Sequence, residues 1–134
     1  MNNLETSVEK FKALMAQQLE RVNQIKQDSE WLDLSNKETI IIGVCWGDGI
    51  GESISNQAQR VMEYVLGDAI QQRKVEIRII DGLTIENRVQ HNKAIPDDVL
   101  AELRECDVIL KGPTTTPQQG DPWPNIESAN VAMR

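Results

Sequence analysis

The sequence predicts an α/β fold, a small parallel sheet flanked by helices, with an additional helix at the N-terminus. Three short apolar runs, at residues 39–45, 74–80 and 107–110, alternate with segments of helical periodicity, which is typical of parallel sheets. The first run is almost continuously β-branched, as expected for a strand covered on both faces. We therefore assign residues 38–134 to the α/β domain and residues 1–37 to an amphipathic helix and linker.

The composition is that of one domain with a negative charge. The 134 residues are enough to bury a core, and 40% of them are apolar. The net charge of −7 argues against binding to nucleic acid or to an anionic membrane. Residues 1–10 lack the apolar stretch of a signal peptide. Cys45 and Cys106 lack the spacing of zinc ligands. We expect a cytoplasmic protein with two buried thiols.

The first element is a helix over residues 4–28. Apolar residues recur in it at spacings of three, four and seven: Leu4, Val8, Phe11, Met15, Val22 and Ile25, with Leu14 and Leu19 widening the stripe. Gln18 lies inside the stripe and makes it a poor coiled-coil seam. The helix either packs on its own domain or contacts a partner. Trp31 and Leu32, in the linker, are expected to contact the domain surface.

A glycine-rich turn, residues 47–51, joins the first strand to the next helix. That helix has an apolar face formed by six residues: Ile54, Ala58, Val61, Met62, Val65 and Leu66. Tyr64, also in this helix, is expected to be a packing residue. Glycines allow positive φ and close backbone approach, and a helix N-terminus favours an anion. The turn is either an anion site or a tight connection, and Asp48 is either a site residue or a capping residue.

The second half of the chain contains two more strands and a helix. Residues 74–80 alternate charged and apolar side chains, which predicts a half-exposed or edge strand. Residues 83–94 are polar and irregular, with a helical turn at most, and we expect His91 at the surface. Pro96 begins a helix with two aspartates in its first turn, which match the helix dipole. Residues 107–110 are predicted to form a short buried strand.

Polar side chains follow the third strand. Lys111 precedes a Gly-Pro turn and three threonines, and Ser128, Asn130 and Arg134 come later. In an open α/β sheet, ligands bind beyond the carboxyl ends of the strands. Lysine supplies a point charge, and the arginine fork matches a carboxylate. These residues indicate a local site for an anionic ligand on an acidic protein.

Three motifs resemble those of the β-decarboxylating dehydrogenases, which comprise the isocitrate and 3-isopropylmalate dehydrogenases. Residues 47–51 resemble the family's G-D-G-I-G-P-E segment. Residues 111–117 resemble the K-G-P-x-T-T-P segment of the isocitrate branch, and residues 128–134 resemble its S-x-N-x-x-x-R. The resemblance covers roughly residues 39–134, with the motifs in the right order. It leaves the N-terminal helix unexplained.

The resemblance implies a partial isocitrate/isopropylmalate-dehydrogenase-like fold. It also implies oxidative decarboxylation of isocitrate or a related 2-hydroxy acid, with NAD or NADP and with Mg²⁺ or Mn²⁺. The residues implied for substrate carboxylates are Ser128, Asn130, Arg134, Lys111 and Thr116. Those implied for the cofactor are Thr115, Thr116, Gly47, Asp48, Gly49 and Ile50. The family's catalytic Tyr and Lys and its metal-binding aspartates lie beyond the matched segment, so we assign no catalytic residue and no metal ligand.

The sequence departs from the family pattern at two places. Glu52-Ser53 replace the expected Pro-Glu, and residues 118–127 replace a short glycine-rich turn with a longer loop that ends in Glu127. That glutamate would repel a tricarboxylate. With half a site, the chain is expected to be inactive alone.

Two interpretations remain open. The chain is the truncated N-terminal part of an isocitrate-type oxidoreductase, or it is a short non-catalytic carboxylate-binding or regulatory and assembly protein derived from that family. In both, an uncovered sheet edge or apolar face predicts a homo-oligomer or a completing partner segment.

Overall fold

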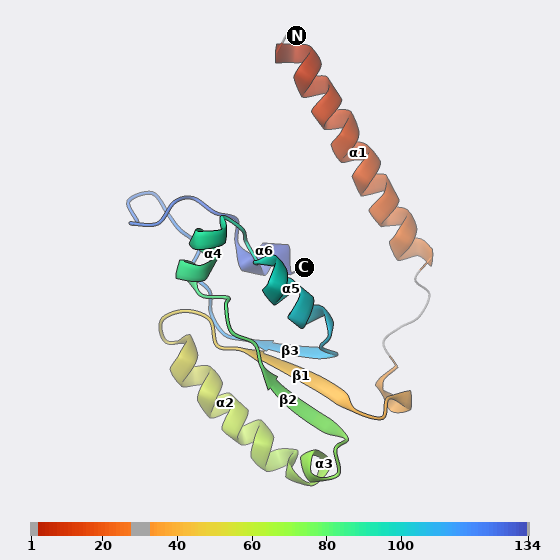
Figure 1. Ribbon diagram of the computed structural model, residues 1–134, viewed down its shortest axis with the longest axis vertical. Helices are drawn as coiled ribbons and strands as arrows, with labels where there is room; N and C mark the ends of the chain where they lie inside the picture. The colour runs from red at the N-terminus through yellow and green to blue at the C-terminus, as the bar shows by residue number, and fades with distance from the viewer. Residues whose placement is uncertain (1–2, 28–32, 134) are drawn as a thin grey trace. The chain divides into compact units, whose positions relative to one another are not determined.

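The computed structural model describes residues 3–27 and 33–133, in two units, Met1–Asn36 and Lys37–Arg134. The first unit contains helix α1 (Asn3–Gln27), drawn in red in Figure 1, and a short 3-10 helix, η1 (Leu34–Asn36). The predicted helix is confirmed to within one residue at each end. The expected contacts of the linker side chains at positions 31 and 32 lie outside the described residues.

The second unit is built on a parallel sheet, as predicted. Strand β1 (Ile40–Cys45) lies between β2 (Val75–Ile79) and β3 (Val108–Lys111), so that the described strand order is β2-β1-β3 (Figure 1). Both pairings are parallel, and Ile42 of β1 is opposite Ile77 and Val108. All three strands therefore end at the same edge of the sheet.

Helices cover the two faces of this sheet. Helices α2 (Gly51–Val65) and α3 (Gly67–Gln71) lie on one side, and α5 (Asp97–Arg104) and α6 (Ala129–Ala132) lie on the other (Figure 1). The connection from β1 to β2 runs through α2 and α3, and the connection from β2 to β3 runs through α4 (Ile85–His91) and α5. The chain therefore passes from the central strand β1 to β2 on one side of it, and then crosses to β3 on the other side. The carboxyl ends of β1 and β3 form the topological switch point, where open α/β sheets bind ligands.

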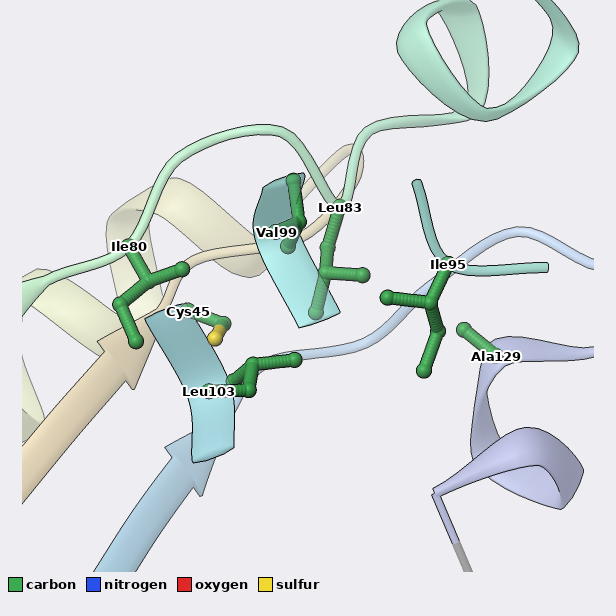
Figure 2. Packing of buried hydrophobic residues seen from close by; sticks show 7 residues of the cluster. All are labelled: Cys45, Ile80, Leu83, Ile95, Val99, Leu103 and Ala129. Atoms are coloured by element: carbon green, nitrogen blue, oxygen red, sulfur yellow. The ribbon is translucent and has the colours of Figure 1, made fainter. Parts of the chain in front are cut away.

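The hydrophobic core lies between the sheet and α5. Figure 2 shows the buried cluster, which draws on β1, the segment after β2, the loop before α5, α5 itself and α6: Cys45, Ile80, Leu83, Ile95, Val99, Leu103 and Ala129. Val99 and Leu103 are one helical turn apart, so both face the sheet. The core therefore anchors α5 and α6 behind the carboxyl edge of the sheet.

The face of α2 differs from the prediction. Ala58, Met62 and Leu66 are half-buried, but Val61 is 62% exposed and Tyr64 is 90% exposed. The expectation that Tyr64 is a packing residue is wrong, and only part of the apolar face is covered. A sheet of the described three strands is narrow, so it covers one stripe of the helix and leaves the flanking apolar side chains in solvent.

The strands and the segment before α5 also differ in part from expectation. The predicted burial of β3 is wrong, because Val108 is 42% exposed and Ile109 is 37% exposed at an edge of the described sheet. β2 is the other edge strand, as predicted. Residues 83–94, expected to be irregular, contain α4, which Thr84 caps and Asn92 ends in a left-handed conformation. Cys45 is buried and Cys106 is only partly so.

Two further expectations can be compared with the structure. His91 is exposed, as predicted, and its Nδ1 lies 2.9 Å from the Asn87 carbonyl oxygen. The helix after Pro96 has Asp97 and Asp98 in its first turn, also as predicted. Across residues 3–27 and 33–133, no helix has the length and apolar character needed to cross a membrane.

Candidate functional site

Two loops meet at the switch point, the glycine turn after β1 and the loop after β3. The backbone N–H of Asp48 donates to the carbonyl of Pro113 at 2.8 Å. Gly47 has φ of 76°, and a Cβ placed there would lie 2.0 Å from the Pro113 oxygen. A Cβ on Gly112 would lie 2.0 Å from the Trp46 oxygen. Glycine at both positions therefore permits the close approach of the two loops.

The carboxylate of Asp48 ties together three segments of the fold. Its Oδ1 accepts a hydrogen bond from the N–H of Ile85 at 2.7 Å, at the start of α4. Its Oδ2 accepts one from the N–H of Thr115 at 2.6 Å. The Asp48 side chain does not cap the helix that follows its own turn, and both of its oxygens instead hold backbone donors of distant segments. Its contact with a cofactor stays a prediction.

Arg88, in α4, is the site residue that sequence reasoning missed. Arg88 carries a charge, yet it is completely buried. It is the largest fully buried side chain in the part of the chain that the structure describes. Its Nε donates to Ala94 O at 2.9 Å, its Nη1 to Thr115 O at 2.7 Å, and its Nη2 to Glu127 O at 2.8 Å. Burial lowers the pKa of this guanidinium, and the charge of Asp48 opposes the shift. Arg88 is thus a buried cation whose partners are backbone carbonyls.

Those carbonyls link the two segments that carry the predicted substrate residues. Thr115 belongs to the loop after β3 that contains three threonines, residues 112–117, called the threonine loop below. Glu127 directly precedes Ser128 at the start of α6. No spacing in the sequence marks this role, because the partners are main-chain atoms. The buried guanidinium of Arg88 therefore fixes the loop after β3 relative to the α6 segment.

Lys111, at the end of β3, supports the threonine loop from within. Its Nζ donates to Gly112 O at 2.7 Å and to the hydroxyl of Thr114 at 3.0 Å. The side chain is half-buried, and burial lowers the pKa of the ammonium. Thr115 is half-buried and Thr116 is exposed. The loop thus offers Thr116 to solvent on a fixed backbone.

The third predicted motif lies on α6. Ser128 occupies the N-cap position and is half-buried, and no side-chain capping bond from it is present in the described structure. Asn130 is exposed, and Ala129 between them is fully buried in the core. Arg134 lies outside the described residues. Two of the three polar side chains of this motif are therefore on a helix that the core holds in place.

The exposed part of the glycine turn is Gly49 and Ile50. A Cβ on Gly49 would meet no described atom within 4 Å, so this tip is open to a ligand. A pocket of about 230 Å³ lies beside the turn, and its lining includes Trp46, Glu52 and Asp81. The indole Nε1 of Trp46 is buried without a hydrogen-bond partner among the described residues. A ligand in this pocket would face the carboxylates of Glu52 and Asp81.

The loop that departs from the family pattern has a defined structure. The N–H of Gln118 donates to the carboxylate of Asp121 at 2.8 Å, and Gly120 has φ of 103°. A pocket of about 410 Å³ is lined by this loop: Pro117, Gln118, Gln119, Gly120, Asp121, Trp123 and Asn125. The extra residues thus form a polar hollow between the second and third motifs.

The amino-acid sequence was compared with known protein families and with curated proteins. Residues 41–134 match the family described as isocitrate/isopropylmalate dehydrogenase. The chain is 31% identical over 110 residues to the isocitrate dehydrogenase [NADP] of Haloferax volcanii, which covers 82% of this chain and 25% of that protein. It is 35% identical over 100 residues to the isocitrate dehydrogenase [NADP] of Coxiella burnetii, covering 70% and 22% respectively.

The second branch of the family is also represented among the matches. The chain is 39% identical over 71 residues to the 3-isopropylmalate dehydrogenase of Desulfitobacterium hafniense, covering 53% of this chain and 19% of that one. No solved structure gives a significant match. The aligned segment spans about a quarter of the length of these curated relatives.

Proposed function

Because this chain belongs to the isocitrate/isopropylmalate dehydrogenase family, we propose that it supplies the carboxylate-binding part of a dehydrogenase active site. The proposed reaction is oxidation of isocitrate or a related 2-hydroxy acid by NAD or NADP, followed by decarboxylation. One observation carries the proposal. The backbone of Thr115 is held from both sides by Asp48 and Arg88 at the switch point.

The proposed substrate contacts come from the second and third motifs. The hydroxyl of Ser128 and the amide of Asn130 would orient one carboxylate by hydrogen bonds, and Arg134 would bind it as an ion pair. Lys111 would add positive charge beneath the threonine loop, and the exposed hydroxyl of Thr116 would contact the substrate. Fixing the carboxylates in this way orients the carbon that loses a hydride, which is the protein's main task in such chemistry.

The proposed cofactor is a nicotinamide dinucleotide, which accepts the hydride when bound. Thr115, Thr116 and the tip of the glycine turn would contact it. The pocket beside the turn supports a fit to a sugar rather than to a phosphate. The carboxylates of Glu52 and Asp81, which line this pocket, accept hydrogen bonds from hydroxyls and repel a phosphate.

A divalent metal does not fit the part of the chain that the structure describes. No group of three or more His, Cys, Asp and Glu side chains is placed there to hold an ion. We therefore assign no step to a metal, and we expect no turnover from this polypeptide alone.

The test is a titration of the isotope-labelled chain with isocitrate, followed by backbone amide shifts in NMR spectra. We expect saturable shifts at residues 114–116 and 128–130, and weaker binding for Ser128→Ala. Sodium chloride at matched ionic strength is the control for unspecific charge effects. Unchanged spectra at millimolar isocitrate, or shifts spread over the acidic surface, would refute the proposal.

The second candidate function is a non-catalytic carboxylate-binding or regulatory protein. The observation that favours it is the loop that departs from the family pattern, which lines a pocket between the second and third motifs. The intact mass of the polypeptide from its native source separates the two, together with an absorbance assay with isocitrate, Mg²⁺ and NADP⁺. A mass far above 15.1 kDa with cofactor reduction supports the dehydrogenase, and a mass of 15.1 kDa without turnover supports the binding protein.

A further inference from the structure

Helix α1 carries a continuous apolar stripe that no other described residue of the first unit covers. All eight large apolar side chains of the helix are at least 44% exposed: Leu4, Val8, Phe11, Leu14, Met15, Leu19, Val22 and Ile25. Six of them, together with Gln18, follow one another at alternating spacings of four and three residues. This alternation is the heptad pattern, which keeps one seam facing a partner helix along its whole length.

The stripe is large enough for a stable helix pair. A helix of 25 residues is about 37 Å long. Seven apolar side chains between Val8 and Ile25 from each of two such helices would bury on the order of 1,000 Å², which reaches the lower range of specific interfaces. An amphipathic helix with this stripe gains free energy when the apolar side chains are covered.

The charges that flank the seam select the arrangement. The first turn of α1 is acidic, with Glu5, and the last turn is basic, with Lys26. Both residues lie on the same flank of the heptad seam. In an antiparallel pair of identical helices, the same flank of each helix faces that of the other, running in the opposite direction. Glu5 of each copy therefore lies beside Lys26 of the other copy, which gives two equivalent ion pairs. In a parallel, in-register pair, Arg21 would lie beside Lys26 of the second copy, which is repulsive.

We propose that α1 is a dimerisation helix that pairs antiparallel with α1 of a second copy of this chain. The pairing aligns residues whose numbers sum to 33. Val8 faces Ile25, Phe11 faces Val22, and Met15 faces the one polar seam residue, Gln18. This inference is independent of the dehydrogenase activity.

Gln18, which weakens the seam, gains a role in this register. The two Gln18 side chains lie in adjacent layers on either side of the two-fold axis, where each can hydrogen-bond to the other. A single polar residue in a seam costs stability but can specify register and orientation, here by placing the two Gln18 side chains in adjacent layers at the middle of the pair. The interruption of the stripe therefore supports one defined dimer rather than unspecific aggregation.

The first test is the solution mass of the full chain, measured by sedimentation over a range of concentrations. We expect a dimer near twice 15.1 kDa. Phe11→Asp, in the seam, should give a monomer. Ala13→Asp, on the side of the same helix away from the seam, should leave the dimer intact. A monomeric wild-type chain, which would result if the stripe packs on its own domain, overturns the proposal. A dimer that survives Phe11→Asp also overturns it.

The second test determines the orientation. Lys26→Glu places like charges beside each other in the antiparallel pair and should weaken the dimer several-fold. The double variant Glu5→Lys with Lys26→Glu should restore it. In a parallel pair, Lys26→Glu would instead strengthen the dimer through Arg21. Lys10→Glu, outside the seam and its two flanks, makes the same change of charge and should change the dimer little. A strengthened Lys26→Glu dimer would overturn the antiparallel arrangement.

Discussion

Asp48 and Arg88 bind the two backbone groups of the same residue, Thr115. Asp48 accepts its N–H at 2.6 Å, and Arg88 donates to its carbonyl at 2.7 Å. The two opposite charges are thereby joined through one stretch of backbone, and each offsets part of the cost of burying the other. The threonine loop is fixed by charged hydrogen bonds, which are stronger than those between neutral groups.

The first prediction concerns Arg88→Met, which keeps much of the side-chain length and removes the charge and the donors. Three carbonyls lose their partner, and the charge of Asp48 loses its compensation, so the free energy of unfolding should fall by about 3 kcal/mol. Urea denaturation measures the loss. Arg104→Met, at an exposed site on α5, is the matched control and should change stability by less than about 0.5 kcal/mol. Equal effects of the two substitutions would contradict a structural role for Arg88.

The second prediction concerns Asp48→Asn. An amide keeps the shape of the carboxylate, but its NH₂ group cannot accept from one of the two backbone donors, and Arg88 keeps its charge without the nearby anion. We expect a loss of about 2 kcal/mol in the free energy of unfolding. Asp81→Asn, at an exposed position, is the control.

A double-mutant cycle between Asp48→Asn and Arg88→Met should show coupling, because the two residues share Thr115 as a partner. Strict additivity of the two losses would mean that the residues act independently.

The elements of the fold could be predicted from local patterns, but the network at the site could not. Residues 40–45 are apolar and largely β-branched, which predicts a buried strand. The three motif segments follow strands or begin helices, so their position near the carboxyl ends of the strands could be predicted. Arg88 could not be identified, because its partners are backbone carbonyls at positions 94, 115 and 127, which any folded chain provides. Tyr64 was misjudged because periodicity identifies an apolar face but not the width of the sheet that covers it.

The third prediction uses the two glycines of the turn as a matched pair. Both have positive φ, 76° at Gly47 and 57° at Gly49, so alanine strains the backbone at each. At Gly49 the new methyl group meets no described atom within 4 Å, and the cost should be about 1 kcal/mol. At Gly47 it would lie 2.0 Å from the Pro113 oxygen, so the two loops must separate. Thermal unfolding should show a much larger loss for Gly47→Ala, and similar losses would disprove the close approach.

The last prediction concerns pH and the buried thiol of Cys45. Burial raises its pKa from 9.0 to about 11. Below pH 9 the thiol is protonated in both the folded and the unfolded chain, so it contributes nothing to pH dependence there. Between pH 9 and 11 the unfolded chain loses this proton and the folded chain keeps it. Stability should therefore fall across this window, by about 2 kcal/mol from this group.

Denaturation of the wild type and of Cys45→Ala at a series of pH values isolates that contribution, because all other groups titrate in both proteins. The difference in unfolding free energy between the two should be constant up to pH 9 and shrink above it. The same burial predicts that Cys45 resists thiol reagents in the folded chain at pH 8 and reacts on unfolding. Rapid labelling of Cys45 in the folded chain, or a constant difference up to pH 11, would show that the thiol is accessible to solvent.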